Sequence, residues 1–332
     1  MKHIHIGIIG TGETLRQAAF AWKAVPGAVI AAMASTGDDD LPALRYDLNM
    51  GYDIALEDDP VKVPGLDGVD GVELAYCDAE KTNHSRLALG NGKHLLLHKP
   101  VAGDTDRAQS LADAVANTGI TCQIIDPVLQ HPFIAMARKA MDDDLLGELQ
   151  HIRVKSCLGA HGEHLVMAGD HFLRSEPFDK IALMELLMGP IAQVHCYGRP
   201  GNCMVSLKFA AAARYGVHEA VHAPDLPVGD GQPPVDEVIE ITGMDGVLFL
   251  RNLRAEMVVA PKFSLKRKDT VTVKDDATAY APDALATLAR QRFARGIRKP
   301  RHGGNDLALA LRAAKVNAAI ALSLKESRPV TV

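Results

Sequence analysis

The sequence predicts an α/β protein with two domains, an N-terminal doubly wound parallel sheet and a C-terminal α+β domain with a mostly antiparallel open sheet. Over the first 125 residues, short apolar runs alternate with helical patterns, which is typical of a parallel sheet. After Pro127, strand-like segments follow one another without helices between them. The length of 332 residues also favours two domains, which we place at residues 1–125 and 126–332.

In the first domain, Ile4–Ile9 is almost continuously apolar, as expected of a strand buried on both faces. Pro26 and Gly27 end the helix that follows it. The predicted strands are residues 4–9, 28–34, 69–77, 94–98 and 120–125, and the predicted helices are residues 13–25, 43–49, 83–89 and 104–117.

In the second domain, a long strand over Leu149–Leu158 leads into a histidine-rich loop. Asp245-Gly246 is a hairpin signal between two later strands. The remaining predicted strands are residues 191–197, 203–209, 214–222, 238–242 and 247–250, and the predicted helices are residues 132–141, 177–188, 283–295 and 306–325. Successive strands with helices gathered around them predict an antiparallel sheet covered on one face.

Composition excludes several classes of protein. A net charge of −5 gives no global field for nucleic acid or for an anionic membrane. No stretch approaches 18 uninterrupted apolar residues, and the apolar run at the N-terminus is too short for a signal peptide. The 5 cysteines include no C-x-x-C pair. We therefore expect a cytoplasmic protein with free thiols.

The first predicted strand ends in Gly10-Thr11-Gly12 and opens directly into a helix that begins with Glu13 and Thr14. This arrangement is typical of the Rossmann dinucleotide site, where glycines allow backbone amides at a helix N-terminus to approach a pyrophosphate. We therefore predict that these five residues bind a dinucleotide. The third glycine of that fingerprint would fall at position 15, where this chain has leucine.

The choice between the two nicotinamide dinucleotides depends on the end of the second strand. Ser35 and Thr36 stand where an acidic residue would accept the ribose hydroxyl of NAD, and Arg45 follows nearby. Small hydroxyl residues leave room for a 2′-phosphate, which favours NADP slightly over NAD. Alternatively, Ser35 and Thr36 only begin a turn.

The segment Gly92-Lys93-His94-Leu95-Leu96-Leu97-His98-Lys99-Pro100 resembles the G-K-H-V-L-x-E-K-P signature of the Gfo/Idh/MocA oxidoreductases. Further segments are similar to that family in the same order along the chain: residues 7–12, 69–84, 146–148, 243–246, 303–306 and 328–332. The resemblance implies a Rossmann domain followed by a substrate-binding and oligomerisation domain.

The resemblance also implies roles for individual residues. Lys99 corresponds to the lysine that bridges the cofactor ribose and the reacting hydroxyl or carbonyl, and an ammonium there polarises the substrate oxygen. Ala79, His84 and Pro100 are expected beside the cofactor, although His84 is equally well interpreted as a buried structural histidine. His98 replaces the glutamate of the family signature.

The second domain departs from the family pattern. Alignment from Leu187 backwards puts Asp179 where the family carries its acid/base histidine. Asp179 could replace that base if burial raised its pKa, or it is a first-turn acid favoured by the helix dipole. Four residues of the preceding loop are alternatives: His171 as acid/base, and His161, His164 and Arg174 as substrate ligands. The spacing of these histidines matches no metal site, so we predict no bound metal.

His218-Glu219-Ala220-Val221-His222 matches the zinc-protease pattern H-E-x-x-H. That motif requires a helix, but Tyr215-Gly216-Val217 before it favours a strand. On a strand the two histidines would lie about 13 Å apart, too far to share one ion, so we reject this interpretation.

Together these features predict an NAD(P)-dependent oxidoreductase that moves a hydride between nicotinamide and a hydroxyl or carbonyl carbon of a sugar, cyclitol or sugar acid. Two alternatives stay open: a cofactor-assisted lyase, isomerase or glycosidase without net redox change, and a non-catalytic sugar or dinucleotide sensor. We expect a small carbohydrate-like ligand, no nucleic acid or membrane partner, and a homodimer or homotetramer formed through the open sheet.

Overall fold

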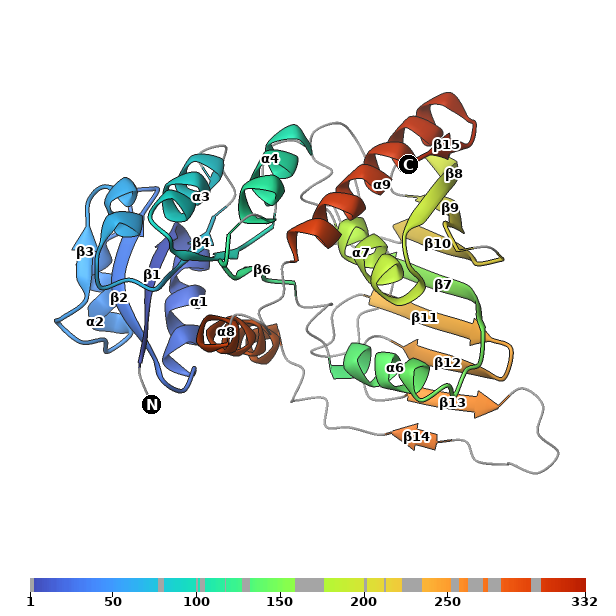
Figure 1. The fold of residues 1–332 in the computed structure, drawn as a ribbon, viewed down its shortest axis with the longest axis horizontal. Coiled ribbons are helices and arrows are strands. Elements are labelled where there is room, and N and C mark those ends of the chain that lie inside the picture. The colour runs from blue at the N-terminus through green and yellow to red at the C-terminus, as the bar shows by residue number, and fades with distance from the viewer. Residues whose placement is uncertain are drawn as a thin grey trace. The chain divides into compact units, whose positions relative to one another are not determined.

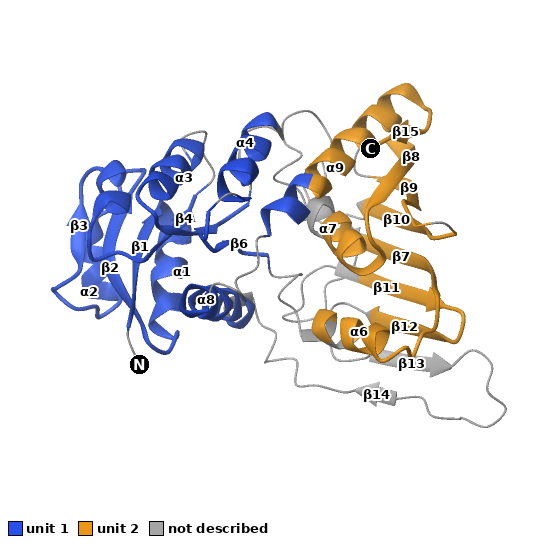
Figure 2. Ribbon diagram, in the orientation of Figure 1, with its two compact units in different colours: residues 1–127, 282–311 blue, residues 128–281, 312–332 orange. Residues whose placement is uncertain are grey.

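A computed structural model gives the fold of the chain and describes residues 3–76, 81–99, 101, 105–116, 118–126, 132–158, 176–199, 202–211, 213–222, 235–251, 257–261, 271–273, 282–299 and 306–332. The chain divides into two compact units (Figure 2). The first contains Met1–Pro127 together with Pro282–Leu311, and the second contains Val128–Ala281 with Arg312–Val332. The chain thus returns to the first unit over Pro282–Leu311, a stretch that sequence analysis had placed in the second domain.

The first unit is built on a parallel sheet of six strands in the order β3-β2-β1-β4-β5-β6 (Figure 1). The strands are β1 Ile4–Gly10, β2 Ala28–Ser35, β3 Ala55–Glu57, β4 Gly71–Ala75, β5 His94–Leu97 and β6 Cys122–Ile124. The helices are α1 Gly12–Lys23, α2 Leu41–Asp47, the 3₁₀ helix η1 Pro60–Gly65, α3 Lys81–Gly90, α4 Thr105–Ala116 and α8 Pro282–Arg298. The predicted doubly wound parallel sheet is confirmed.

The core of the first unit lies between the sheet and helices α1 and α8. Trp22 of α1 meets the ring of Phe293 of α8 edge-on, with ring centroids 6.3 Å apart. Leu15 is fully buried in this core. A leucine therefore fills the space between α1 and the sheet where the fingerprint has its third glycine, and a Cβ on Gly10 would lie only 3.1 Å from the Cβ of Leu15.

The second unit is built on a nine-stranded sheet in the order β14-β13-β12-β11-β7-β10-β9-β8-β15. Every neighbouring pair is antiparallel except β7 and β10. The strands are β7 Leu149–Leu158, β8 Ile191–Arg199, β9 Asn202–Phe209, β10 Tyr215–His222, β11 Val235–Gly243, β12 Gly246–Arg251, β13 Met257–Pro261, β14 Val271–Val273 and β15 Val330–Thr331. This confirms the predicted, mostly antiparallel sheet.

Helices α6 Pro132–Asp142, α7 Glu176–Met188 and α9 Leu307–Glu326 accompany this sheet. Alternate residues such as Ile152 and Val154 are buried, while Arg153 between them is exposed. One face of the sheet is therefore packed and the other is open. The H-E-x-x-H segment lies in β10, so its predicted strand conformation is confirmed.

Helix α9 is long and apolar enough by length and composition to cross a membrane, although the sequence analysis expected no membrane span. In the structure 56% of its most hydrophobic window is buried, with Ala313, Val316 and Ile320 almost fully enclosed. Burial of this extent is typical of a core helix of a globular protein.

Two of the segments that carry the family resemblance lie against each other in the second unit. The amide of Asp245 donates to the carbonyl of Leu146 at 2.9 Å, and the amide of Met244 donates to the carbonyl of Glu148 at 3.0 Å. A Cβ on Gly243 would overlap the carbonyl oxygen of Leu146. Glycine is therefore required where the hairpin passes the turn before β7.

We expect Gly243→Ala to destabilise the protein by about 2 kcal/mol or more, because the new methyl group meets backbone that cannot rotate away. Thermal and urea unfolding of the purified variant would measure the loss. Gly68→Ala is the matched control, since a Cβ there meets nothing within 4 Å. Equal unfolding midpoints for the two variants would contradict this account.

Candidate active site

The turn between β1 and α1 has the geometry of a dinucleotide site. Thr11 is the N-cap residue of α1, and Gly12 has a φ of +55° with open space where a Cβ would stand. The side of the turn away from the sheet is exposed from Thr11 to Glu13, while Thr14 is half-buried. These exposed residues lie at the positive end of the dipole of α1, which favours an anion there.

The loop after β2 folds back over this turn and brings a carboxylate to it. The amide of Gly12 donates to both carboxylate oxygens of Asp39 at 3.0 Å, and the hydroxyl of Ser35 donates to Oδ2 of Asp39 at 2.5 Å. The amide of Thr36 donates to the carbonyl of Gly10 at 2.9 Å. The hydrogen bond from Ser35, with that from Gly12, lowers the pKa of Asp39 below its ordinary value.

Asp39 is a site residue that sequence reasoning missed. It lies four positions after the end of β2, beyond the place where an acid is normally sought. The signal in the sequence was the run Asp38-Asp39-Asp40, but only the fold shows which member turns inward. Asp40 instead caps α2 by accepting from the amide of Ala43 at 2.9 Å. Arg45 is stacked 4.8 Å from the ring centroid of Tyr52.

In the signature segment around β5, the first residues anchor the strand and the last ones lie at the candidate site. The ammonium of Lys93 donates to the carbonyls of Leu66 and Val69 at 2.9 and 2.8 Å, and Nδ1 of His94 accepts from the amide of Thr121 at 2.8 Å. These contacts fix the beginning of β5 to its neighbours. His98 and Lys99 follow the end of the strand, at the carboxyl edge of the sheet.

His98 belongs to a buried cluster around the carboxylate of Glu73. Glu73 of β4 is fully buried and accepts from Trp22 Nε1 at 2.5 Å, from Arg290 Nε at 2.9 Å and from a second nitrogen of Arg290. Its other contact is His98 Nε2 at 2.7 Å. Burial by itself would raise the pKa of Glu73, but Arg290 and His98 more than offset it and lower the pKa to about 2.

The same burial acts on the imidazole of His98, where desolvation is the largest effect and lowers its pKa below the ordinary value despite the neighbouring Glu73. His98 is therefore neutral near pH 7. Because the ionised Glu73 can only accept a hydrogen bond, Nε2 of His98 is the donor and carries the proton of the neutral imidazole. His98, which stands where the family signature has glutamate, is thus bonded to a carboxylate of the adjacent strand.

Lys99 is held next to an acid that sequence reasoning did not identify. Its Nζ lies 3.4 Å from Oδ2 of Asp126, with side-chain exposures of 18% and 2%. Nearby, the fully buried Lys81 at the start of α3 donates to the carbonyl of His98 at 2.9 Å and lies 5.4 Å from the ring centroid of Tyr76. The end of β5 is therefore fixed by two ammonium groups.

His84 is 6% exposed on α3, and its Nδ1 is hydrogen-bonded to the hydroxyl of Tyr76. This contact agrees with its interpretation as a structural histidine, and its role beside the cofactor stays a prediction.

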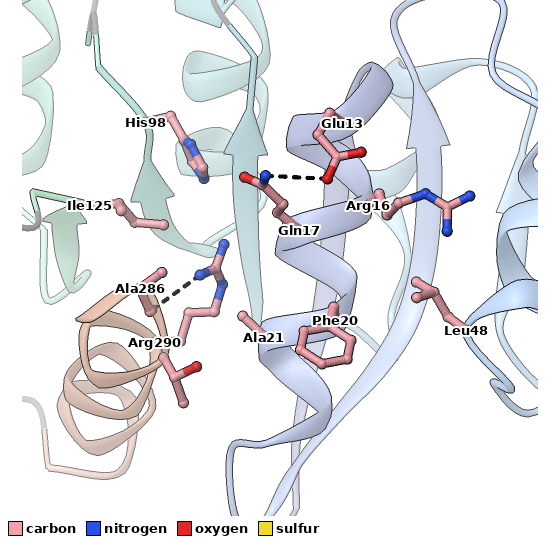
Figure 3. Close-up of a pocket in the computed structure, with 11 residues that line it drawn as sticks. Glu13, Arg16, Gln17, Phe20, Ala21, Leu48, His98, Ile125, Ala286 and Arg290 are labelled. Atoms are coloured by element: carbon pink, nitrogen blue, oxygen red, sulfur yellow. Dashed lines mark hydrogen bonds between the residues drawn. The ribbon is translucent and has the colours of Figure 1, made fainter. Parts of the chain in front are cut away.

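A pocket of about 520 Å³ lies between α1 and α8 and reaches His98 at the edge of the sheet (Figure 3). Figure 3 shows the side chains of Gln17, His98 and Arg290 directed toward one another across it. Its lining residues are Glu13, Arg16, Gln17, Phe20, Ala21, Leu48, His98, Ile125, Ala286, Thr287 and Arg290. Glu13, predicted from the sequence as a cofactor residue, thus borders both the glycine turn and this pocket.

The predicted residues of the second unit are only partly described. Asp179 lies in the first turn of α7, as predicted, but its side chain is outside the described residues. His161, His164, His171 and Arg174 of the loop, and Ala79 and Pro100 of the first unit, also lie outside them. Among the described residues, no group of three or more His, Cys, Asp or Glu could hold a metal ion.

Next to Asp179, Lys180 forms a buried ion pair with Glu237 of β11. His218 of β10 is 3% exposed. Desolvation, with Lys180 nearby, lowers the pKa of His218 to about 4. This histidine of the H-E-x-x-H segment is therefore neutral and buried near pH 7.

Comparison with protein families agrees with this geometry. The model of the Gfo/Idh/MocA oxidoreductase family, described as an NAD-binding Rossmann fold, matches residues 4–125. Residues 4–125 therefore match the NAD-binding Rossmann domain of that family. The match covers β1 through β6 and includes both the glycine turn and Lys99.

Solved structures share the fold of this chain over its whole length. Levoglucosan dehydrogenase in complex with NADH and levoglucosan has a TM-score of 0.81 at 16% identity and covers 100% of both chains. Scyllo-inositol dehydrogenase from Lactobacillus casei has a TM-score of 0.77 at 16% identity and covers 99% of this chain and 98% of its own. An oxidoreductase from Agrobacterium radiobacter, in complex with NAD+, L-tartaric acid and magnesium, has a TM-score of 0.82 at 14% identity. That match covers 99% of this chain and 98% of the oxidoreductase.

The Glu73 cluster makes a prediction about stability. Glu73→Gln would leave the buried guanidinium of Arg290 without its counter-charge, and we expect the free energy of unfolding to fall by roughly 3–5 kcal/mol. Glu148→Gln, at an exposed glutamate, is the control and should change it by less than about 0.5 kcal/mol. Urea unfolding at pH 7 would measure both variants.

The pH dependence of the same measurement gives a second readout. Because the pKa of Glu73 is lowered to about 2, its contribution is complete above about pH 4.5 and is lost as the pH falls toward 2. The stability gap between the wild type and Glu73→Gln should therefore narrow in acid. If the difference in unfolding free energy between the wild type and Glu73→Gln did not change with pH, Glu73 would not be the ionised partner of Arg290.

Proposed function

We propose that the protein is an NAD(H)-dependent oxidoreductase that transfers a hydride between the nicotinamide and a hydroxyl or carbonyl carbon of a sugar, cyclitol or sugar acid. The observation that carries this proposal is the ammonium of Lys99, held at the sheet edge that also bears the glycine turn. Structures of similar fold in complex with levoglucosan, L-sorbose or L-tartaric acid support the substrate class.

The residues of the first unit fit a dinucleotide. The turn at Gly12 is exposed, with open space where a Cβ would stand, so a phosphate can approach the N-terminus of α1 beside the Gly12 amide that Asp39 holds. The carboxylate of Asp39 can accept hydrogen bonds from the hydroxyls of the adenosine ribose. The same negative charge would repel a 2′-phosphate. We therefore favour NAD, whereas the sequence alone favoured NADP.

In the proposed mechanism, the bound nicotinamide supplies the carbon that gives or accepts the hydride. Lys99 donates a hydrogen bond to the substrate oxygen. In carbonyl reduction the ammonium stabilises the negative charge that develops on that oxygen, and in alcohol oxidation it stabilises the alkoxide. We assign the exchange of the hydroxyl proton to Asp179 or to one of His161, His164 and His171, and the orientation of substrate hydroxyl or carboxylate groups to Arg174.

Cofactor binding tests the proposal directly. In fluorescence titrations the wild-type protein should bind NADH more tightly than NADPH, while Asp39→Asn should improve the affinity for NADPH relative to NADH by about tenfold, because the repelling charge is gone. Asp38→Asn, at the exposed neighbouring position, is the matched control and should leave the ratio unchanged. Folded protein, free of carried-over nucleotide, that binds neither dinucleotide would refute the proposal.

Lys99→Ala tests the chemistry. With any sugar or cyclitol found to turn over, we expect kcat to fall by a factor of about 10²–10⁴, with the dissociation constant of NADH changing only a few-fold. Steady-state kinetics beside the fluorescence titration would separate the two effects. Lys139→Ala, at an exposed lysine of α6, should leave both unchanged. Full activity of Lys99→Ala would remove Lys99 from the mechanism.

A further inference from the structure

We propose that Asp126 is the positioning residue for Lys99: its buried carboxylate fixes the ammonium at the edge of the sheet and keeps it protonated. The functional meaning of this pair rests on the proposed function, because Lys99 must meet the substrate. The pairing itself can be tested without substrate or cofactor.

The register of the sheet brings the two residues together. β5 and β6 are parallel neighbours, and Leu97 is opposite Ile124 in the last pair of their ladder. Lys99 and Asp126 each follow two residues later. The ammonium and the carboxylate thus follow adjacent strand ends, and they lie 3.4 Å apart.

Burial makes this contact stronger than a surface ion pair. Asp126 is 1% exposed, so its carboxylate has little water to solvate it, and a buried charge requires a partner. Lys99, with its side chain 18% exposed, covers the carboxylate and still reaches the surface. One end of the pair is thus anchored in the protein while the other is accessible to a ligand.

Other charged groups around the end of β5 are engaged by different partners. Lys81 of α3 donates to the carbonyl of His98. Glu73 of β4 is paired with Arg290 of α8 and bonded to the neutral imidazole of His98. Tyr76 is bonded to His84. Among the described residues, Asp126 is an acid that lies against Lys99, at 3.4 Å, and a negative charge at that distance favours the charged form of the lysine.

The positioning role explains why an acid stands at the end of β6. A lysine side chain has four rotatable bonds, and a free ammonium would sample many positions. The contact with Asp126 restricts those positions before any substrate arrives. A protonated ammonium is also the form that can donate to a carbonyl oxygen and stabilise an alkoxide.

Competitive labelling of the full-length protein would test the pair. Trace acetic anhydride modifies only unprotonated amines, and mass spectrometry of the peptide that contains Lys99 gives its labelling rate at each pH. We expect Asp126→Asn to move the midpoint of this profile down by about one pH unit, so that labelling at pH 8 rises about tenfold.

The exposed pair of Lys139 and Asp143 on α6, with a distance of 2.7 Å, provides the matched control. Asp143→Asn should move the profile of Lys139 by no more than a few tenths of a pH unit, because water screens this pair. Asp126→Glu keeps the charge and should restore most of the wild-type profile of Lys99.

An unchanged Lys99 profile in folded Asp126→Asn protein would overturn the proposal. If Asp126→Asn does not fold, the wild-type profile decides: a Lys99 midpoint clearly below that of an ordinary lysine, about 10.4, would also overturn it. The NADH titration is a separate readout. Failure to bind NADH together with the expected Lys99 shift would refute the proposed function and leave the pair intact.

Discussion

The buried carboxylate of Glu73 is the interaction on which the first unit depends. Its position on β4, in the middle of the sheet, removes it from water, so it is stable as a charge only if donors surround it. Those donors come from α1, from the end of β5 and from α8. Arg290 lies 217 residues further along the chain than Glu73. One charged group therefore joins the returning helix α8 to the nucleotide-binding sheet.

The hydrogen bonds that surround Glu73 also position residues of the candidate site. Its bond to His98 fixes the residue directly before Lys99, and the buried ammonium of Lys81 holds the carbonyl of the same residue. Lys99 thus emerges from a turn that is held from two sides. His98, which stands where the family signature has glutamate, meets the acid of the neighbouring strand at the end of β5.

The glycine turn between β1 and α1 is also held by a carboxylate, that of Asp39. Asp39 accepts from the amide of Gly12 and from Ser35, so the loop after β2 is closed onto the start of α1. A negative charge held there suits ribose hydroxyls and disfavours a further phosphate. The preference for NAD that we propose therefore rests on how a polar loop folds, and not on which residue ends the strand.

The sequence by itself determined much of this protein. Alternation of apolar runs and helical stripes identified nearly every long element, because burial on both faces of a sheet or on one face of a helix leaves a periodic pattern. Short strands such as β3 and β14, with three residues each, leave too little pattern and were missed. The glycine turn and the G-K-H segment predicted the candidate site because both depend on residues close together in the chain.

Only the tertiary structure decided which acids lie at the candidate site. Asp39, Glu73 and Asp126 look like any other acidic residues in the sequence, and their partners lie on other strands and helices. The sequence also did not reveal that α8 belongs to the first unit. The ion pair of Arg290 with Glu73, which holds α8 there, joins residues that are 217 positions apart in the chain. Local patterns record burial and backbone geometry, whereas the pairing of charges is set by how distant segments come together.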